Sequence, residues 1–177
     1  MSRNGDCMKK TICLAGIPLL VLIDQLTKYW ARTWLSVKGP VVLIPGALEL
    51  RYLTNQGSAW GMLSGQMVFF YIFTILALGI LGFVWYRIPA EKKYRKLLLI
   101  MTFMIAGALG NLIDRVIFRY VIDFIYISLI DFPIFNVADM YVTIPAAFLV
   151  LFVLTVYKDD EFTFLRRKKE PQEKGEQ

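Results

Sequence analysis

The sequence has 177 residues, of which 57% are hydrophobic and only 19% are charged, and its mean hydropathy is +0.54. Soluble domains carry about 25% charged residues, so this composition indicates a membrane protein. The chain has no histidine, which excludes Ser–His, Cys–His and His–metal mechanisms. Its two cysteines, Cys7 and Cys13, are too few for a disulfide framework or a zinc site. Any catalysis is therefore expected to use carboxylates, hydroxyls, amides, lysines or arginines.

The chain carries a net charge of +6, and its basic residues are unevenly distributed. Of the 20 Lys and Arg, 14 fall in three blocks, at residues 3–10, 87–96 and 158–174, which long apolar runs separate. This alternation is typical of the cytoplasmic loops of membrane proteins and not of a groove that follows nucleic-acid phosphates. We therefore expect a membrane protein without a nucleic-acid partner.

Four segments are apolar enough to cross a bilayer, whose hydrocarbon core of ~30 Å requires about 20 helical residues. We predict these spans at about residues 11–34, 67–86, 97–113 and 140–157. No small-x-small cleavage site follows the first span at the right place, so we expect a retained anchor and not a cleaved signal peptide. Because basic blocks stay in the cytoplasm, both termini and the loop between the second and third spans are expected there.

This topology leaves two segments outside the membrane. In the first, residues 41–44 and 48–53 flank a Pro-Gly turn signal and predict strands within a small outer β-region at about residues 35–66. The second, residues 118–135, is apolar but contains acidic residues. We expect it to be a short interfacial segment that lies on or dips into the outer membrane surface.

The tail at residues 158–177 is highly charged, and we expect it to lie in the cytoplasm with residues 170–177 disordered. The whole chain, residues 1–177, is predicted to be a single membrane domain. Its fold class is all-α integral membrane, with four transmembrane helices. A small extracytoplasmic β-region is expected between helices 1 and 2, and the interfacial segment between helices 3 and 4.

Unusual polar residues collect at the outer ends of the predicted spans, where the topology brings distant parts of the sequence together. They are Asp24, Lys28, Asn55, Gly57, Asn111, Asp114, Arg115, Asp123, Asn136 and Asp139. In a membrane protein, an ionisable residue at membrane depth is a candidate for function by default. The sequence therefore predicts one site near the outer face of the membrane.

Several of these residues also have structural interpretations. Asp24 and Lys28 are four residues apart, a spacing that allows an ion pair, which could either orient the first span or contact a substrate. Asp114 next to Arg115 is interpreted as structural. The small residues among 106–110 predict close packing between helices.

Asp123 and Asp139 are harder to explain by structure alone, although Asp139 could cap the fourth helix. Two carboxyl groups within ~3 Å of each other share one proton, because both cannot ionise. The ionised member can take a proton from water while the protonated member hydrogen-bonds the scissile carbonyl. In a chain without histidine, such a pair favours aspartic peptidase chemistry, which needs no metal and no cofactor.

Two other functions remain open at this point. A small membrane transporter or channel component would use Asp24, Asp123 and Asp139 as proton or cation sites. Four spans without an internal repeat argue against a self-contained transporter, although a homo-oligomer would evade that objection. A structural assembly protein would use the same acids as a helix cap and a surface charge.

Four blocks of the sequence resemble lipoprotein signal peptidase (signal peptidase II), a family of bacterial aspartic peptidases of the cytoplasmic membrane. The blocks are residues 24–28 (DQLTK), 55–60 (NQGSAW), 107–115 (GALGNLIDR) with 121–124 (VIDF), and 132–139 (FPIFNVAD). One block alone would be weak evidence, whereas four blocks in the same order are highly specific.

The resemblance implies that Asp123 and Asp139 form the catalytic dyad. It also implies a diacylglyceryl-modified prolipoprotein as substrate, cut on the N-terminal side of the lipidated cysteine. The family positions taken to shape the site or hold the substrate are matched by Asp24, Lys28, Asn55, Gly57, Asn111, Arg115 and Asn136. We expect a monomer among membrane lipids in the bacterial cytoplasmic (inner) membrane, with its active site near the outer face.

Overall fold

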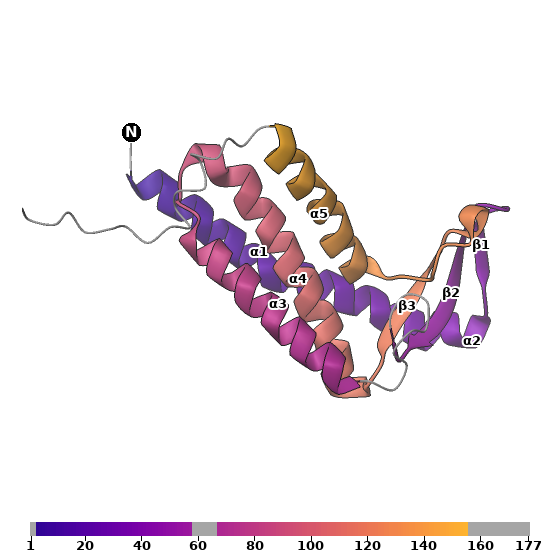
Figure 1. Cartoon of the computed structure of the whole chain (residues 1–177). Helices are drawn as coiled ribbons and strands as arrows, with labels where there is room; N and C mark the ends of the chain where they lie inside the picture. Colours follow the sequence, from indigo (N-terminus) through magenta and orange to yellow (C-terminus); the bar gives the residue numbers. More distant parts are fainter. Residues whose placement is uncertain (1–2, 58–66, 156–177) are drawn as a thin grey trace, which may run out of the picture.

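The structure is a computed structural model that describes residues 3–57 and 67–155 (Figure 1). Its long helices are α1 (Arg3–Trp30), α3 (Met67–Arg87), α4 (Arg95–Phe118) and α5 (Val137–Thr155). The predicted cytoplasmic tail and the last three residues of the NQGSAW block lie outside the described residues.

Four helical segments of the described chain are long and apolar enough to cross a membrane, which confirms the predicted number of spans. They are Lys10–Lys38, Val68–Arg87, Lys92–Phe118 and Val137–Thr155. The first continues beyond α1 through a π-helical turn, Ala31–Leu35, and a short helix α2, Ser36–Lys38. The third begins with a 3-10 turn, η2 (Lys92–Tyr94), and α4 continues beyond the predicted end of its span at residue 113.

α4 is the central helix of the bundle, since it contacts α1, α3 and α5 (Figure 1). Two glycines on its surface allow the closest of these contacts. A Cβ atom at Gly107 would collide with the backbone oxygen of Ala138 in α5, and one at Gly110 would collide with the carboxylate of Asp24 in α1. The small residues predicted to pack helices therefore let α5 and α1 approach α4.

A three-stranded antiparallel sheet lies at one end of the bundle, which we call the sheet end (Figure 1). Its strands, in order across the sheet, are β1 (Val41–Ile44), β2 (Leu48–Asn55) and β3 (Val121–Tyr126). β1 and β2 confirm the predicted β-region. Gly46 in the turn between them has φ of 71°, a conformation that glycine adopts without steric cost.

β3 lies within the segment that was expected to be interfacial, and the sequence did not predict a strand there. The first four residues of β3 are all buried, and the run lacks the alternation of apolar and polar residues that marks a half-buried strand. β3 pairs with β2, with Asp123 opposite Leu53, and a 3-10 turn, η3 (Ser128–Ile130), follows it. Asp123 is therefore fixed in a sheet.

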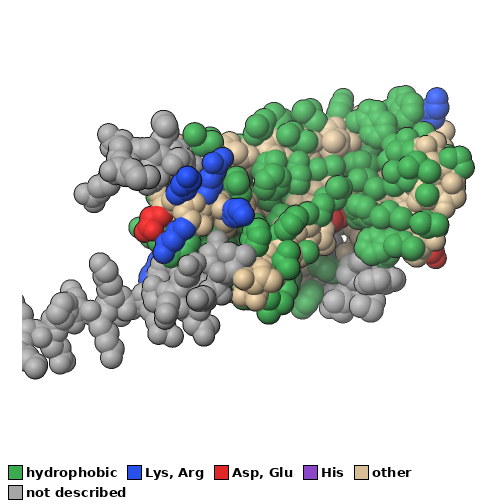
Figure 2. Space-filling view, turned by 90° about the horizontal axis from the view of Figure 1, so that it is seen from above, with side chains coloured by type: hydrophobic (Ala, Val, Ile, Leu, Met, Phe, Trp, Pro, Cys, Tyr) green, Lys and Arg blue, Asp and Glu red, His purple; other side chains and the backbone are tan. Residues whose placement is uncertain are grey.

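Two apolar clusters stabilise the two ends of the bundle. One is centred on the first turns of α4 and includes Leu97 and Met101. The other, at the sheet end, packs Leu35 against Ile122 and Phe124 of β3. Figure 2 shows hydrophobic side chains over the flank of the bundle, with most of the visible Lys and Arg at the end opposite the sheet. This distribution suits a helical bundle surrounded by lipid.

Candidate active site

The two aspartates of the predicted dyad lie at the sheet end on different elements. Asp123 is the third residue of β3 and is only 2% exposed. Asp139 lies in the first turn of α5 and is half-buried. The sheet and the helical bundle therefore each contribute one carboxyl group to the site.

Asn136 links the two carboxyl groups and also begins α5. Its Oδ1 accepts a hydrogen bond from the backbone N–H of Asp139 at 3.0 Å, and Asp139 Oδ2 accepts one from the backbone N–H of Asn136 at 3.1 Å. This reciprocal pair is a capping box in which Asn136 is the N-cap. Asn136 Nδ2 donates to Asp123 Oδ1 at 2.6 Å. The interpretation of Asp139 as the cap is therefore corrected, because that position belongs to Asn136.

Asp123 accepts hydrogen bonds from two amide side chains. Asn55 Nδ2 donates to its Oδ2 at 2.8 Å, and Asn136 Nδ2 donates to its Oδ1. Burial and the nearby charge of Asp139 raise the pKa of Asp123 to about 7, and the two amide hydrogen bonds oppose this rise only in part. At neutral pH the carboxyl group therefore exists in both protonation states, as proton exchange with a substrate requires.

α4 positions Asp139 through Asn111. Asn111 Nδ2 donates to Asp139 Oδ1 at 2.7 Å, while Asn111 Oδ1 accepts from Asn136 Nδ2 at 3.2 Å and from Lys28 Nζ at 2.9 Å. Arg115, one turn further along α4, donates to the backbone oxygen of Asn111 at 3.4 Å. Its guanidinium interacts electrostatically with both aspartates of the pair. One face of α4 therefore contributes an amide and a positive charge to the site.

Asn55 and Gly57 approach the site from the end of β2. The Oδ1 of Asn55 accepts a hydrogen bond from the backbone N–H of Gly57 at 2.9 Å, and its Nδ2 is the donor to Asp123. The Gly57 N–H holds the amide oxygen of Asn55, so the amide nitrogen of Asn55 is the end that faces the carboxyl group of Asp123. Gly57 is thus placed to orient Asn55.

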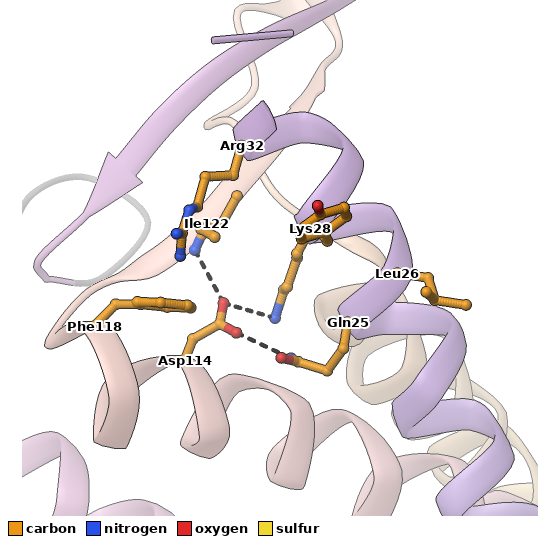
Figure 3. A pocket seen from close by; sticks show the side chains of 8 residues that line it. Gln25, Leu26, Lys28, Arg32, Asp114, Phe118 and Ile122 are labelled. Atoms are coloured by element: carbon orange, nitrogen blue, oxygen red, sulfur yellow. Dashed lines mark hydrogen bonds and ion pairs between the residues drawn. The ribbon is translucent and has the colours of Figure 1, made fainter. Parts of the chain in front are cut away.

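A second cluster of charges is centred on Lys28 and is linked to the aspartate pair through Asn111; Figure 3 shows Lys28 with Asp114. Lys28 Nζ lies 2.9 Å from Asp24 Oδ2 and 3.1 Å from Asp114 Oδ2, and it donates to Asn111 Oδ1. All three charged side chains of this cluster are at most 1% exposed. Because each of the three ammonium protons has an acceptor, the charge of Lys28 is neutralised within the protein.

Asp24 connects α1 to the other helices that form the site. Its Oδ1 accepts a hydrogen bond from the backbone N–H of Ala138 in α5 at 2.9 Å, and its Oδ2 accepts one from Gln25 at 3.1 Å. The ion pair with Lys28 that the sequence spacing allows is present. Of the two roles considered for this pair, the geometry supports the orientation of the first span.

Asp114 has partners that its sequence neighbours do not indicate. Its Oδ2 accepts from the backbone N–H of Ile122 in β3 at 3.1 Å, and its Oδ1 accepts from Gln25 Nε2 at 2.9 Å. Its ion-pair partner is Lys28, and Arg115 forms no ion pair with it among the described residues. No role was predicted for Gln25, whose only signal in the sequence is its place in the DQLTK block. Asp114 and Gln25 therefore hold α1, α4 and β3 together.

The arrangement as a whole brings two carboxyl groups to one asparagine and holds each of them by amide hydrogen bonds. Among the described residues, no group of three or more His, Cys, Asp and Glu could hold a metal ion. The fold and the site define a multi-pass membrane protein with an aspartate pair at one end of its bundle. The sequence profile of signal peptidase (SPase) II matches residues 17–155. The chain belongs to this family and is a peptidase of the bacterial membrane.

Relatives and solved structures agree with this assignment. A lipoprotein signal peptidase of Latilactobacillus sakei is 47% identical over 127 residues, which cover 71% of this chain and 82% of that protein. One from Streptococcus pyogenes serotype M5 is 36% identical over 155 residues, which cover 88% and 99%. Neither is a transporter or an assembly protein, so those two alternatives receive no support.

Two solved structures, each described as a bacterial membrane enzyme studied by the in meso method, share the fold. The one at 2.3 Å resolution has a TM-score of 0.74 and 33% identity, and the match covers 90% of this chain and 94% of that one. The one at 1.9 Å has a TM-score of 0.70 and 34% identity, and covers 83% and 95%. These matches confirm the four-helix membrane fold.

Proposed function

We propose that this chain is an aspartic endopeptidase that removes the signal peptide from diacylglyceryl-modified prolipoproteins, cutting on the N-terminal side of the lipidated cysteine. The observation that carries the proposal is that Asn136 forms hydrogen bonds with both Asp123 and Asp139. Burial and the charge of Asp139 also raise the pKa of Asp123 to about 7. The relatives in Latilactobacillus and Streptococcus are named lipoprotein signal peptidases, which supports this substrate class.

In the first step, Asp139 is ionised and Asp123 is protonated. A water oxygen attacks the carbonyl carbon of the scissile peptide bond, and a proton of that water passes to Asp139. The proton of Asp123 passes to the carbonyl oxygen, so that the intermediate is a neutral tetrahedral diol. Asn55 and Asn136 then donate hydrogen bonds to an ionised Asp123, where such bonds are stronger.

In the second step, the diol collapses and the carbon–nitrogen bond breaks. The leaving nitrogen takes the proton from Asp139, and one hydroxyl of the diol returns a proton to Asp123. Both carboxyl groups are then in their starting protonation states. The cycle consumes one water molecule and requires no metal and no cofactor.

A position of the aspartate pair near the outer face would explain why a lipid on the substrate is needed. The acyl chains of a diacylated cysteine stay in the bilayer and hold the adjacent peptide bond at its surface. Trp30 at the end of α1 and Trp34 in the π-helical turn that follows are exposed, as is typical of residues at this interface. The positive-inside rule supports cytoplasmic termini and a pair near the outer face. We propose that the enzyme acts as a monomer among membrane lipids.

The test is cleavage of a diacylated prolipoprotein by the full-length protein in detergent or liposomes. Asp123→Asn and Asp139→Asn are each expected to lower the cleavage rate by about 10⁴-fold or more, because each removes one partner of the proton exchange. Asp131→Asn is the matched control. Asp131 is an exposed carboxylate at the same end of the molecule and accepts a hydrogen bond from Tyr126, so its variant is expected to cleave at the wild-type rate.

Two results would contradict the proposal. If either dyad variant inserts and folds but keeps near-normal activity, that aspartate has no part in the chemistry. If the wild type cleaves the precursor equally well before and after diacylation, the substrate class is wrong.

A further inference from the structure

A cavity of about 300 Å³ lies between α1 and the last turns of α4, next to the Lys28 cluster (Figure 3). Its lining residues are Gln25, Leu26, Lys28, Tyr29, Arg32, Asp114, Phe118 and Ile122. Neither aspartate of the proposed dyad lines it. The proposed cleavage mechanism therefore does not use this cavity.

Arg32 presents a guanidinium group to the cavity (Figure 3). The group lies over the ring of Phe118, 4.6 Å from the ring centroid, which restricts its orientation. The ion pairs and side-chain hydrogen bonds between described residues leave its five N–H donors unused. A guanidinium held in this way is suited to bind a phosphate or carboxylate through two hydrogen bonds.

The one carboxylate in the cavity wall does not prevent an anion from binding. Asp114 pairs with Lys28 at 3.1 Å, and its two oxygens also accept hydrogen bonds from Gln25 Nε2 and the backbone N–H of Ile122 (Figure 3). Its charge is therefore balanced inside the protein. Arg32 also faces the cavity, and no carboxylate among the described residues pairs with it.

Along α1, the exposed residues that precede Arg32 change from apolar to polar, as a phospholipid does from its acyl chains to its headgroup. Leu22, Leu26 and Tyr29 are 53%, 58% and 65% exposed, and their spacing of three to four residues places them on one face with Arg32. Exposed leucines on a membrane helix face acyl chains, whereas tyrosine and arginine lie at the depth of the headgroups. The exposed Trp30 beside this face marks the same depth.

We propose that this cavity binds the phosphodiester headgroup of a membrane phospholipid, with Arg32 on the phosphate and the acyl chains along Leu26 and Leu22. The cavity has the volume of a small ligand site, which is enough for a headgroup while the chains remain in the bilayer. A free phosphate ion would pair with the guanidinium but would leave the leucines uncovered. The apolar part of this face therefore favours a lipid as the source of the phosphate.

The test measures binding of dioleoyl phosphatidylglycerol to the full-length protein in detergent, by native mass spectrometry and by the shift of the thermal unfolding midpoint. We expect saturable binding that raises the midpoint of the wild type. Glycerol phosphate, which carries the headgroup without acyl chains, is expected to produce no shift at the same concentration.

Variants of the cavity wall locate the site. Arg32→Gln is expected to weaken binding about tenfold, the scale of one charge-assisted pair. Lys38→Gln is the matched control, because Lys38 is exposed, lies at the same end of the helix and does not line the cavity. It removes the same charge and should bind as the wild type does. Phe118→Leu keeps an apolar wall but removes the ring below the guanidinium, so a smaller loss is expected.

Three results would overturn the proposal. The first is equal affinity of the wild type and Arg32→Gln for phosphatidylglycerol, or no saturable binding at all. The second is a midpoint shift with glycerol phosphate as large as with the lipid, which would identify a site for soluble anions. The third is an equal loss in Lys38→Gln, which would show that the lipid is attracted by overall charge and not by this cavity.

Discussion

Asp24 and Asp114 share the buried ammonium group of Lys28, at 2.9 and 3.1 Å, whereas the hydrogen bonds to Asp123 and Asp139 come from side-chain and backbone amides. Burial alone does not separate Asp123 from the Lys28 cluster, because Asp24 and Asp114 are 0% exposed and Asp123 is 2% exposed, whereas Asp139 is half-buried. The two clusters also lie at the same end of the bundle and are joined through one asparagine of α4. What differs is the chemical nature of their partners.

This difference determines what each cluster can do. A buried carboxylate that forms an ion pair is held in that pair, because losing the carboxylate would leave the cation alone in a medium of low dielectric constant. A buried carboxyl group held by amides can change its protonation state, since amides can donate to either form. The pKa of Asp123, raised to about 7, reflects this freedom. The Lys28 cluster therefore stabilises the fold, and the aspartate pair is left able to exchange protons.

The largest expected effect comes from the same substitution made in each cluster. Asp123→Asn should lower cleavage about 10⁴-fold but cost little stability at pH 8, although its amide nitrogen faces one of the two asparagine donors. Because the pKa of Asp123 is raised in the folded protein, stability is lost as pH rises from about 4 to about 7, and asparagine avoids that loss. Asp114→Asn should instead lower the free energy of unfolding by about 3 kcal/mol, because Lys28 loses a partner. Cleavage rates and unfolding curves of both variants, measured in one detergent, check these expectations. A large loss of stability in Asp123→Asn with a small loss in Asp114→Asn would contradict the roles given to the two clusters.

The next largest effect is expected when the charge of Lys28 is removed. Lys28→Met leaves two buried carboxylates without their counter-charge, so the free energy of unfolding should fall by about 3–5 kcal/mol. Lys38→Met is the control, because that side chain is exposed and its loss should change stability by no more than about 0.5 kcal/mol. Chemical unfolding in mixed micelles measures both variants. Wild-type stability of Lys28→Met would mean that the cluster does not hold the helices together.

A smaller effect is expected from the helix contact below the Lys28 cluster. Gly110→Ala places a methyl group against the carboxylate of Asp24 and should cost about 1–3 kcal/mol of stability, with a matching loss of active enzyme. In Gly79→Ala the new methyl group meets nothing within 4 Å, so this variant should be as stable as the wild type or slightly more stable. Thermal unfolding compares the pair, and equal midpoints would contradict the close contact.

The smallest effect concerns pH. Wild-type cleavage should fall as pH rises through about 7, because ionised Asp123 has no proton to give to the substrate. The hydrogen bond from Asn55 favours the ionised form and lowers this pKa, so Asn55→Ala should move the fall in activity to higher pH by up to about one unit. Thr54→Ala, on the opposite face of β2, should leave the profile unchanged. A shift to lower pH in Asn55→Ala would refute the pKa argument.

Features that depend on neighbouring residues could be predicted from the sequence. The spans follow from the length and hydropathy of continuous runs, and the first two strands follow from a turn signal between short apolar segments. The ion pair of Asp24 and Lys28 follows from helical spacing. The convergence of the polar residues at one end of the bundle follows from the order of the spans.

Features that depend on distant partners could not be predicted in this way. β3 pairs with a strand about seventy positions earlier in the chain, and its burial on both faces removes the alternation by which a strand is recognised. Asp114 is adjacent to Arg115 in sequence, yet its ion-pair partner is Lys28 on another helix. In both cases the tertiary structure selects a partner that local spacing does not indicate.

The position of Asp123 within a strand has a consequence for how members of this family can diverge in length. Side chains alternate between the two faces of a sheet, so inserting one residue before Asp123 in β3 would turn its carboxyl group away from Asn136. Residues 127–134 form a 3-10 turn and irregular chain, which can change length while both aspartates keep their places. Insertions and deletions should therefore accumulate in that connection during evolution, while the strand tolerates them only in steps of two.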